Sequence, residues 1–597
     1  MDISAEVERT VAAFVEPKGY RQPADAFNDG RQALVVLRGA RGSGRRASAL
    51  SLLARSGDGV TECSQDWITG PQVPLLPRAQ DGRYLLDLTG EEDVPATFGS
   101  HLGSYSDVLA GRDARMVILV TPELWRSCER HCHTFTFDLE TPEPEAVLVA
   151  HLGQSAEHLR WYQEEPALRA LVGETSHVRA EELARIITGT AELNAAGASR
   201  VADAFNHWLG YLVEHLGPTV SESEVAQAAK MRERATLIAA AVLDGSPIGA
   251  VLAAADELLH ELGEAPSYRE ILLGDGVTSR FEKLEIETSQ GKVDLMGRHP
   301  GLDRALLAWL WTQRLPMRPR IQRWIERITV DSKIAAGQLA RVADALVGLA
   351  IDQRSLEILG TVEAWVQSGA QHRRLAVSVL ERLAVDPEIG SEVRRRLRNW
   401  AINKTTGPEL LEAVTSVCGG LLGQMNTPAA LARLKLLLGR PEAAVRRGAS
   451  DALQSLADEP AMAKVVATTM SKWSEDAEDH AAHQAVLSLA DPGEENRRAR
   501  QIDALLRDPV RCATLQRSWS AQLTAGNSDA VDLLRRWLAC VDAKVLDREV
   551  VIAALKPVAG SLRGEPFKDL FMTRRDLSAQ EELFRELYAP RPQQVDN

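Results

Sequence analysis

The sequence predicts a multidomain chain of the α/β plus α class, with a parallel α/β domain first and helical domains after it. Three observations support this prediction. Short apolar runs alternate with helical stretches up to about residue 150, which is typical of a parallel sheet with crossover helices. Helical periodicity with one hairpin pattern continues to about residue 330. Beyond that point the strand patterns stop, and helical segments punctuated by Gly, Pro and Asp follow.

The composition limits the classes of function. A chain of 597 residues is too long for a single hydrophobic core. Its formal net charge of −14 disfavours nucleic acid as a general partner. No stretch reaches the roughly 20 apolar residues that span a bilayer, so no membrane association is expected. Six scattered cysteines and an N-terminus unlike a secretory signal predict a cytoplasmic location.

Residues 1–30 predict one helix and a polar approach to the first strand. Five short runs then predict the strands of the parallel sheet. Their apolar or alternating composition is typical of buried and half-buried strands. The runs are LVVL (34–37), GVTEC (59–63), GRYLLDLTG (82–90), RMVILVT (115–121) and HTFTFDLETPEP (133–144).

A glycine-rich turn joins the first run to a helix that begins near residue 45. The segment GARGSG, residues 39–44, satisfies the G-x-x-x-x-G half of a P-loop. Glycines in such a loop let backbone N–H groups converge on phosphate oxygens, and the helix N-terminus adds its dipole. A strand–helix turn that binds nothing remains the alternative. The candidate cofactor-binding residues here are Gly39, Gly42, Ser43, Gly44, Arg45 and Arg46.

Two arginines stand where a P-loop normally carries lysine and a small hydroxyl residue. Arg45 still supplies positive charge and fork-like hydrogen bonds, although it is bulkier than lysine. Arg46 cannot ligate Mg²⁺, which a serine or threonine at its position normally does. Losing the metal removes much of the charge stabilisation that phosphoryl transfer needs. We therefore expect ATP or ADP as the cofactor and weak or absent hydrolysis. The loop gives little support for a bound Mg²⁺ ion.

Asp87 and Thr121 are the catalytic candidates. Asp87 ends the third strand, where a P-loop protein places its metal-coordinating Walker B aspartate. Leu88 and Thr89 follow it, so the usual catalytic acid after this aspartate is missing. Thr121 ends the fourth strand, where related proteins place a polar sensor of the γ-phosphate. A strand-terminal cap is the alternative role for Asp87.

The region from 231 to 330 combines helices with a hairpin. Residues 231–263 predict two helices around a Gly-Ser-Pro turn, and residues 282–296 predict a hairpin with a polar SQGK tip. These are the ingredients of a winged helix. A basic run at 314–327 follows, which leaves DNA phosphate contact as an alternative beside a solvated or interdomain face.

The C-terminal region contains one convincing helical pair, residues 427–458. Its first helix carries Leu431, Leu434 and Leu438 on one side. Its second carries apolar and small residues at helical spacing, which allows close approach of neighbouring helices. The pair resembles a HEAT repeat, so the region is expected to form an α-solenoid that binds a protein partner.

Cysteine and histidine also cluster near the end of the predicted α/β domain. Cys128, His131, Cys132 and His133 are residue types that bind zinc. Their spacing fits no common structural zinc site, and no metal site is predicted.

The order of these features resembles the STAND class of P-loop signalling NTPases. That order is phosphate loop, Asp-ending strand, polar-ending strand, helical segment, winged helix and helical repeats. The resemblance implies a switch that binds ATP or ADP between its core and its winged helix, with a C-terminal array controlling opening and oligomerisation. It also implies that a histidine after the wing contacts the β-phosphate, and His299 is the residue here. The sequence reads Met296-Gly-Arg-His299-Pro300, and departs from the family's Met-His-Asp motif.

The expected protein is a cytoplasmic regulatory or scaffold protein with a degenerate ATPase domain. It is expected to bind a protein partner through its helical repeats and to associate with itself as a homo-oligomer. Two alternatives stay open: a ligand-free scaffold with a pseudo-P-loop, and a winged-helix DNA-binding regulator. The predicted domains are an N-terminal helical segment (1–30), a P-loop NTPase-like α/β domain (31–150), a helical lid (151–230), a winged-helix-like domain (231–330) and a HEAT-like repeat domain (331–597).

Overall fold

A computed structural model of the chain contains two compact units, Met1–Val393 and Arg394–Asn597. The domain boundaries expected within them stay predictions. The described residues are 4–40, 42–57, 59–63, 71–89, 91, 94–173, 177–218, 223–265, 267–330, 332–335, 337–386, 389–476, 478–493 and 498–561. The predicted repeat domain therefore includes a C-terminal segment, 562–597, that lies outside the described residues.

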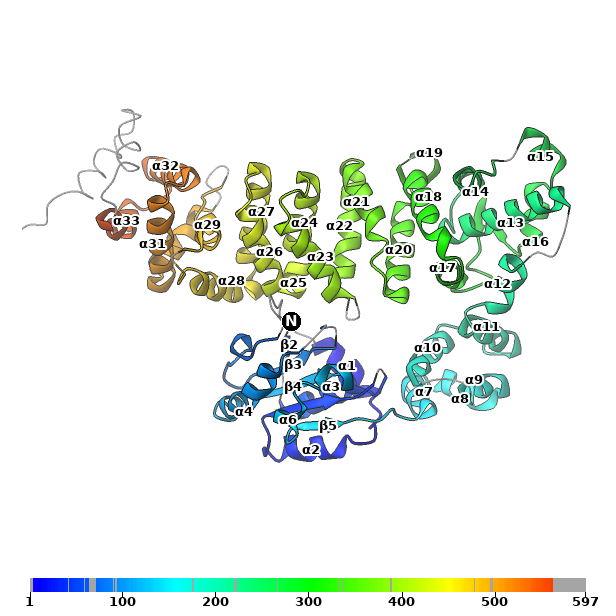
Figure 1. Ribbon diagram of the computed structural model, residues 1–597, viewed down its shortest axis with the longest axis horizontal. Helices are drawn as coiled ribbons and strands as arrows, with labels where there is room; N and C mark the ends of the chain where they lie inside the picture. The colour runs from blue at the N-terminus through cyan, green and yellow to red at the C-terminus, as the bar shows by residue number, and fades with distance from the viewer. Residues whose placement is uncertain are drawn as a thin grey trace, which may run out of the picture. The chain divides into compact units, whose positions relative to one another are not determined.

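A five-stranded parallel sheet forms the centre of the N-terminal domain (Figure 1). The strand order is β2-β3-β4-β1-β5, and every neighbouring pair is parallel. The sequence-based prediction of a parallel α/β domain is thereby confirmed, and each strand lies within one residue of a predicted run. The strands are β1 (Leu34–Arg38), β2 (Val60–Cys63), β3 (Arg83–Asp87), β4 (Arg115–Val120) and β5 (Thr136–Asp138).

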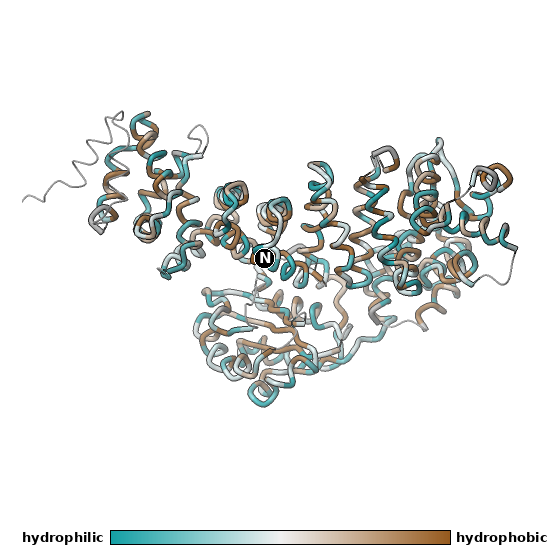
Figure 2. The backbone as a smooth tube through the Cα atoms, turned by 45° about the horizontal axis from the view of Figure 1, so that its top comes forward, coloured by the Kyte–Doolittle hydropathy of each residue, from teal (hydrophilic) through white to brown (hydrophobic). Residues whose placement is uncertain are grey.

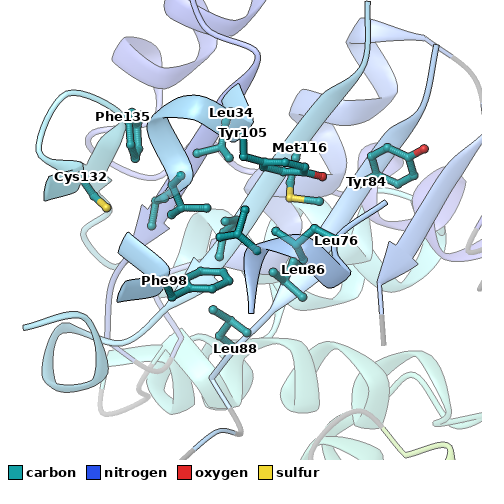
Figure 3. Close-up of a cluster of buried hydrophobic side chains, with 14 of the residues drawn as sticks. Leu34, Leu76, Tyr84, Leu86, Leu88, Phe98, Tyr105, Met116, Cys132 and Phe135 are labelled. Atoms are coloured by element: carbon teal, nitrogen blue, oxygen red, sulfur yellow. The ribbon is translucent and has the colours of Figure 1, made fainter. Parts of the chain in front are cut away.

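Successive residues of the central strands face two different helical layers. Val35 and Val117 pack against α3, whereas Val36 and Ile118 pack against α4 on the opposite face. Figure 3 shows part of the hydrophobic cluster on the α4 side, with Phe98 among the aliphatic side chains of the strands. The helices of this domain are α1 (Ser4–Ala12), α2 (Arg21–Asn28), α3 (Arg45–Ser56), α4 (Ala96–Ala110), α5 (Pro122–Trp125) and α6 (Glu129–Cys132), with a 3₁₀ turn at Val73–Leu75.

The N-terminal segment forms two helices, not the single helix that the sequence predicted. Pro17 and Gly19 lie in the turn between α1 and α2, and the positive φ of 90° at Gly19 suits glycine. Both helices contact α3, on the sheet face that α3 covers. The segment is therefore part of the α/β layer structure.

Helices α7 to α12 follow the sheet. Buried residues from α7, α8, α9, α10 and α11 form a separate core that contains the aromatic side chains of Trp161, Tyr162 and Phe205. The helices are α7 (Pro144–Leu152), α8 (Ala156–Glu164), α9 (Pro166–Gly173), α10 (His177–Thr188), α11 (Ala195–Phe205) and α12 (Leu209–Leu216).

The predicted hairpin is present as an antiparallel pair, β6 and β7. Gln290 and Gly291 form its tip, both with positive φ. The backbone of Gly245 and Ser246, in the predicted Gly-Ser-Pro turn, bonds to Val293 of β7. The elements are α13 (Glu224–Val242), α14 (Ile248–Leu262), α15 (Tyr268–Leu273), α16 (Val277–Lys283), β6 (Glu287–Ser289), β7 (Lys292–Asp294), α17 (Leu302–Gln313), a 3₁₀ turn at Leu315–Met317 and α18 (Arg318–Val330).

The rest of the described chain is helical, as expected for the C-terminal region. The segments that end the first unit are α19 (Ser332–Ala335), α20 (Leu339–Gln353), α21 (Leu359–Gln367), α22 (Ala370–Ala384) and α23 (Gly390–Ile402), the last of which crosses into the second. The second unit continues with α24 (Pro408–Gly419), α25 (Leu421–Met425), α26 (Thr427–Leu438), α27 (Ala443–Asp458), α28 (Pro460–Trp473), α29 (His480–Leu489), α30 (Ala499–Arg507), α31 (Pro509–Thr524), α32 (Ser528–Asp542) and α33 (Arg548–Ser561).

The predicted helical pair is α26 and α27, which pack against each other. Leu431 and Leu434 of α26 are fully buried, and so is Val445 of α27. Small residues do bring helices close, because a Cβ added to Gly419 of α24 would lie 2.9 Å from the Cβ of Ala452. Figure 2 shows apolar and polar residues alternating along these helices.

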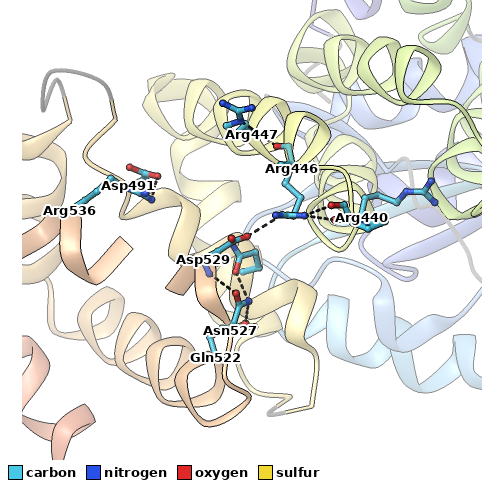
Figure 4. A network of polar contacts seen from close by, with 11 residues as sticks. Arg440, Arg446, Arg447, Asp491, Gln522, Asn527, Asp529 and Arg536 are labelled. Carbon is cyan, nitrogen blue, oxygen red and sulfur yellow. Dashed lines mark hydrogen bonds and ion pairs between the residues drawn. The ribbon is translucent and has the colours of Figure 1, made fainter. Parts of the chain in front are cut away.

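A polar network links α27 to α32 in the second unit (Figure 4). Arg446 donates to the carboxylate of Asp529 at 3.1 Å and to the carbonyl oxygens of Arg440 and Pro441. Arg446 is therefore a structural connector between helices that are far apart in the sequence.

Candidate functional site

The candidate nucleotide site lies at the carboxyl edge of the sheet. Because the strands are parallel, the loop after β1, Asp87 at the end of β3 and Thr121 after β4 all meet at this edge. Strand β4 lies between β1 and β3, so Thr121 is placed between the loop and Asp87. Residues separated by up to 82 positions in the sequence, from 39 to 121, are thus brought to one edge.

The loop has a compact backbone that depends on its glycines. Gly42 and Gly44 have φ values of 80° and 76°. A Cβ on Gly39 would lie 2.2 Å from the hydroxyl oxygen of Ser43, so a larger residue cannot fit there without movement. The Ser43 hydroxyl is 1% exposed and has no hydrogen-bond partner among the described residues. The Ser43 amide donates to the carbonyl of Ala40 at 3.1 Å and closes the turn.

Arg45 begins α3 and extends toward the end of β4. Its Nη1 donates to the carbonyl oxygen of Val120 at 2.7 Å. Burial lowers the pKa of Arg45, and the negative charges of Asp87 and Glu123 oppose that effect. The guanidinium is therefore within electrostatic range of both carboxylates, in the part of the site where the sequence predicted phosphate contact.

Arg46 is held by two carboxylates on the sheet face that α1 and α3 cover. Its guanidinium forms paired hydrogen bonds with Glu6 of α1, at 2.6 and 2.8 Å, and with Glu62 of β2, at 2.7 and 3.0 Å. Burial alone would lower the pKa of Arg46, but these hydrogen bonds outweigh it and raise the pKa. Arg46 thus connects α1, α3 and β2, and the structure gives no support to the predicted role in holding a cofactor.

Asp87 and Thr121 both accept local hydrogen bonds. Oδ1 of Asp87 accepts from the backbone N–H of Thr89 at 2.9 Å and from its hydroxyl at 2.7 Å. The hydroxyl oxygen of Thr121 accepts from the Leu124 amide at 3.2 Å and caps α5. These bonds agree with the capping role that the sequence left open for Asp87, and among the described residues no such bond reaches its second carboxylate oxygen.

A cavity of about 430 Å³ opens after β3 and β4, with Thr121 in its wall and neither Asp87 nor the glycine loop lining it. Hydroxyl and charged side chains dominate its wall. The lining residues are Thr89, Glu91, Thr121, Glu123, Leu124, Arg126 and Ser127. The cavity is large enough for a small polar ligand or a group of water molecules.

His299 lies in a buried aromatic cluster after β7. Its ring is 4% exposed and packs at 5.0 Å from the ring of Trp208 and 4.9 Å from that of Tyr211. Its Nε2 is 3.6 Å from the Glu285 carboxylate, and neither ring nitrogen has a hydrogen bond among the described residues. These neighbours come from the α11–α12 turn, α12 and the segment before β6. The structure thus places His299 at a packed junction, without showing the phosphate contact implied by the resemblance.

The burial of His299 predicts a pH dependence. Burial lowers the pKa of His299 below its ordinary value of 6.5, against the raising effect of Glu285. Since the unfolded chain then binds the proton more tightly, this junction loses stability as the pH falls below about 6.5. We expect hydrogen exchange in 209–216 and 295–302, corrected for intrinsic rates, to accelerate between about pH 7.5 and about pH 5.5. The acceleration should be smaller in His299→Leu, and an equal acceleration there would contradict the assignment.

The basic run after the hairpin is largely neutralised by carboxylates. Arg320 and Arg323 of α18 both pair with Glu261 of α14, at 3.3 and 2.8 Å, and Glu261 itself is buried. Arg318 pairs with Glu357 at 2.7 Å. The two Glu261 pairs lie within the predicted winged-helix-like domain, whereas the Arg318–Glu357 pair joins it to the next predicted domain. None of these contacts favours DNA contact.

The cysteine cluster belongs to the hydrophobic core. Cys128 and Cys132 are both fully buried against α4. Their thiols lie near backbone carbonyl oxygens, with Cys132 Sγ 3.3 Å from that of Gly99. Across the part of the chain that the structure describes, no group of three His, Cys, Asp or Glu residues could hold a metal ion.

Sequence reasoning missed three acidic partners of the loop arginines. Glu6 and Glu62 fix Arg46, and Glu123 faces Arg45. One signal was available for Glu62, because it lies in a short strand that begins with Val60 and ends with Cys63, where a partly buried carboxylate favours a basic partner. Glu6 carried no such signal, since an acidic residue in the first turn of a helix is common.

Comparisons with known proteins give no relative for this chain. No family model matches it, and neither a curated protein nor a solved structure matches it. Within the described ranges, no helix is long and apolar enough to cross a membrane.

Proposed function

We propose that the chain is a regulatory or scaffold protein of the STAND type, whose α/β domain binds ATP or ADP with weak or absent hydrolysis. One observation carries the proposal: parallel strands bring the glycine loop, Asp87 and Thr121 to one edge, where Arg45 donates to the Val120 carbonyl at the end of β4. Backbone amides at a helix N-terminus with an adjacent arginine suit the phosphates of a nucleotide. The Ser43 hydroxyl is buried and has no hydrogen-bond partner among the described residues, which fits a loop whose backbone, and not this side chain, faces the ligand.

The regions after the sheet support the same proposal. Helices α13, α14 and α16 with the β6–β7 hairpin, to which residues 245–248 add backbone pairing, are consistent with a winged helix. The stacked pairs of the second unit, such as α26 and α27, are consistent with HEAT-like repeats that bind a protein partner.

A melting experiment on the full chain tests the proposal. We expect ATP or ADP to raise the midpoint of a thermal transition, because a ligand at a hundredfold excess over Kd stabilises by about 2.7 kcal/mol. Adenosine, which lacks phosphates, should give no shift. The rate of phosphate release should stay far below the roughly 1–10³ per second that is typical of enzymes. Turnover in that range, lost in Asp87→Ala, would show a working ATPase instead.

A ligand-free scaffold is the second candidate. The observation in its favour is that Arg45 already donates to the Val120 carbonyl and Arg46 to two glutamates, so both side chains have partners within the chain. A chain that shows no thermal shift with ATP or ADP would support this candidate over the first.

A further inference from the structure

We infer that the loop binds its nucleotide as the metal-free anion, with the Arg45 guanidinium in place of a divalent cation. This inference rests on the proposed nucleotide site and goes beyond it by naming the form of the ligand. The fold implies Mg²⁺ at such a loop, but the residues present do not fit that ion.

The position that normally ligates the cation is committed elsewhere. Arg46 has no lone pair for a metal, and its guanidinium is held by Glu6 and Glu62 through four hydrogen bonds of 3.0 Å or less. Its side chain is only 26% exposed, so it is built into the packing of α1 against α3. Because the Arg46 side chain is directed to these glutamates, position 46 offers no group that could replace the missing hydroxyl.

The neighbouring hydroxyls cannot take over this role. Ser43 and Ser48 are 1% and 0% exposed, and neither hydroxyl has a hydrogen-bond partner among the described residues. Mg²⁺ requires near-octahedral coordination and keeps several of its waters. A hydrated cation cannot reach side chains that are enclosed beneath the loop.

Arg45 already places a positive charge where a cation would act. Its Nη1 donates to the Val120 carbonyl oxygen at 2.7 Å, and the negative charges of Asp87 and Glu123 act on its guanidinium. A divalent cation bound next to Asp87 would be repelled by this guanidinium. A polyphosphate that arrives without a metal keeps its full negative charge for Arg45 and the loop amides.

The inference predicts an unusual effect of magnesium. Mg²⁺ in solution complexes ATP, lowers its negative charge and occupies the oxygens that Arg45 and the loop would contact. We therefore expect Mg²⁺ to weaken binding, whereas a P-loop with its usual metal ligand binds the magnesium complex.

Calorimetric titration of the full chain with ATP tests this expectation, in EDTA and in excess MgCl₂ at matched ionic strength. We expect the apparent Kd to be at least about tenfold weaker in MgCl₂, the size of one lost charge-assisted contact. Equal or tighter binding in MgCl₂ would overturn the inference and leave the nucleotide site standing. Absence of binding in both buffers would instead overturn the proposed function.

Two substitutions at position 45 locate the effect. Arg45→Gln should weaken ATP binding in EDTA by about tenfold or more and remove most of the difference between the two buffers. Arg45→Lys keeps the charge and should retain binding in EDTA within a few-fold, which checks that the site survives substitution. Arg130→Gln removes an exposed arginine of α6 in the same domain and should change neither value. An undiminished magnesium effect in Arg45→Gln would contradict the role given to Arg45.

Discussion

Replacing Arg46 with alanine is expected to lower the free energy of unfolding of the N-terminal α/β domain by about 2–4 kcal/mol. The substitution leaves the carboxylates of Glu6 and Glu62 without their common partner, and their side chains are only 33% and 16% exposed. Removing one member of a partly buried ion pair costs more than the pair contributes, because the remaining charges stay desolvated. The attachment of α1 to α3 is weakened at the same time.

Thermal unfolding of the full chain and hydrogen exchange together measure this loss. The transition of the α/β domain should begin about 5–10 °C lower, and amides of α1 and α3 should exchange faster. Arg130→Ala, at an exposed position of α6, serves as the matched control and should shift the transition little. A free energy of unfolding of Arg46→Ala within about 0.5 kcal/mol of that of the parent chain would show that the Glu6–Arg46–Glu62 clamp contributes little.

Replacing Arg433 with alanine is expected to destabilise the second unit by a similar amount, about 2–4 kcal/mol. Arg433 of α26 is 1% exposed, which is rare for arginine. Its Nη1 donates to the carbonyl of Ala429 at 2.7 Å, and its Nε donates to the carbonyl of Arg394 at 3.1 Å. Truncation removes these additional hydrogen bonds from two buried helix carbonyl oxygens and opens a cavity beside α23.

Two further variants separate these causes. Arg433→Met keeps most of the side-chain volume and should recover the part of the loss that comes from the cavity. Arg447→Ala, at an exposed site on the neighbouring helix α27, is the control for removing an arginine as such. Urea unfolding followed by circular dichroism measures the stability of each variant. We expect Arg433→Ala to be the least stable, Arg433→Met to be intermediate and Arg447→Ala to be close to the parent chain. A parent-like Arg433→Ala would contradict this account.

The sheet could be predicted from the sequence because its signals are local. Runs such as LVVL and RMVILVT are apolar enough to be buried on both faces, and both became strands between helical layers. The hairpin near residue 290 was predictable for the same reason, since alternation and a polar tip are contained within 15 residues. Its strands are shorter than the pattern indicated, only three residues each.

The strand-end positions of Asp87 and Thr121 were predictable from the sequence, but the directions of side chains in this region were not. A side chain's direction depends on partners that are distant in the sequence, and Arg46 turns toward a glutamate 40 positions before it. The same limit applies to His299, whose place beside Trp208 depends on packing between segments 91 positions apart. The two-helix form of the N-terminus was missed because Pro17 and Gly19 were not recognised as a break.

The clamp of Glu6, Arg46 and Glu62 also constrains the evolutionary routes open to this chain. At the proposed nucleotide site, a threonine at position 46 would supply a hydroxyl that can ligate magnesium, yet the same change would remove the arginine that Glu6 and Glu62 share. If either glutamate changed first, the charged Arg46 would instead lose two of its four hydrogen bonds to these carboxylates. A lineage carrying this clamp therefore reaches a metal-assisted hydrolase only through coordinated changes at all three positions, with less stable intermediates in between.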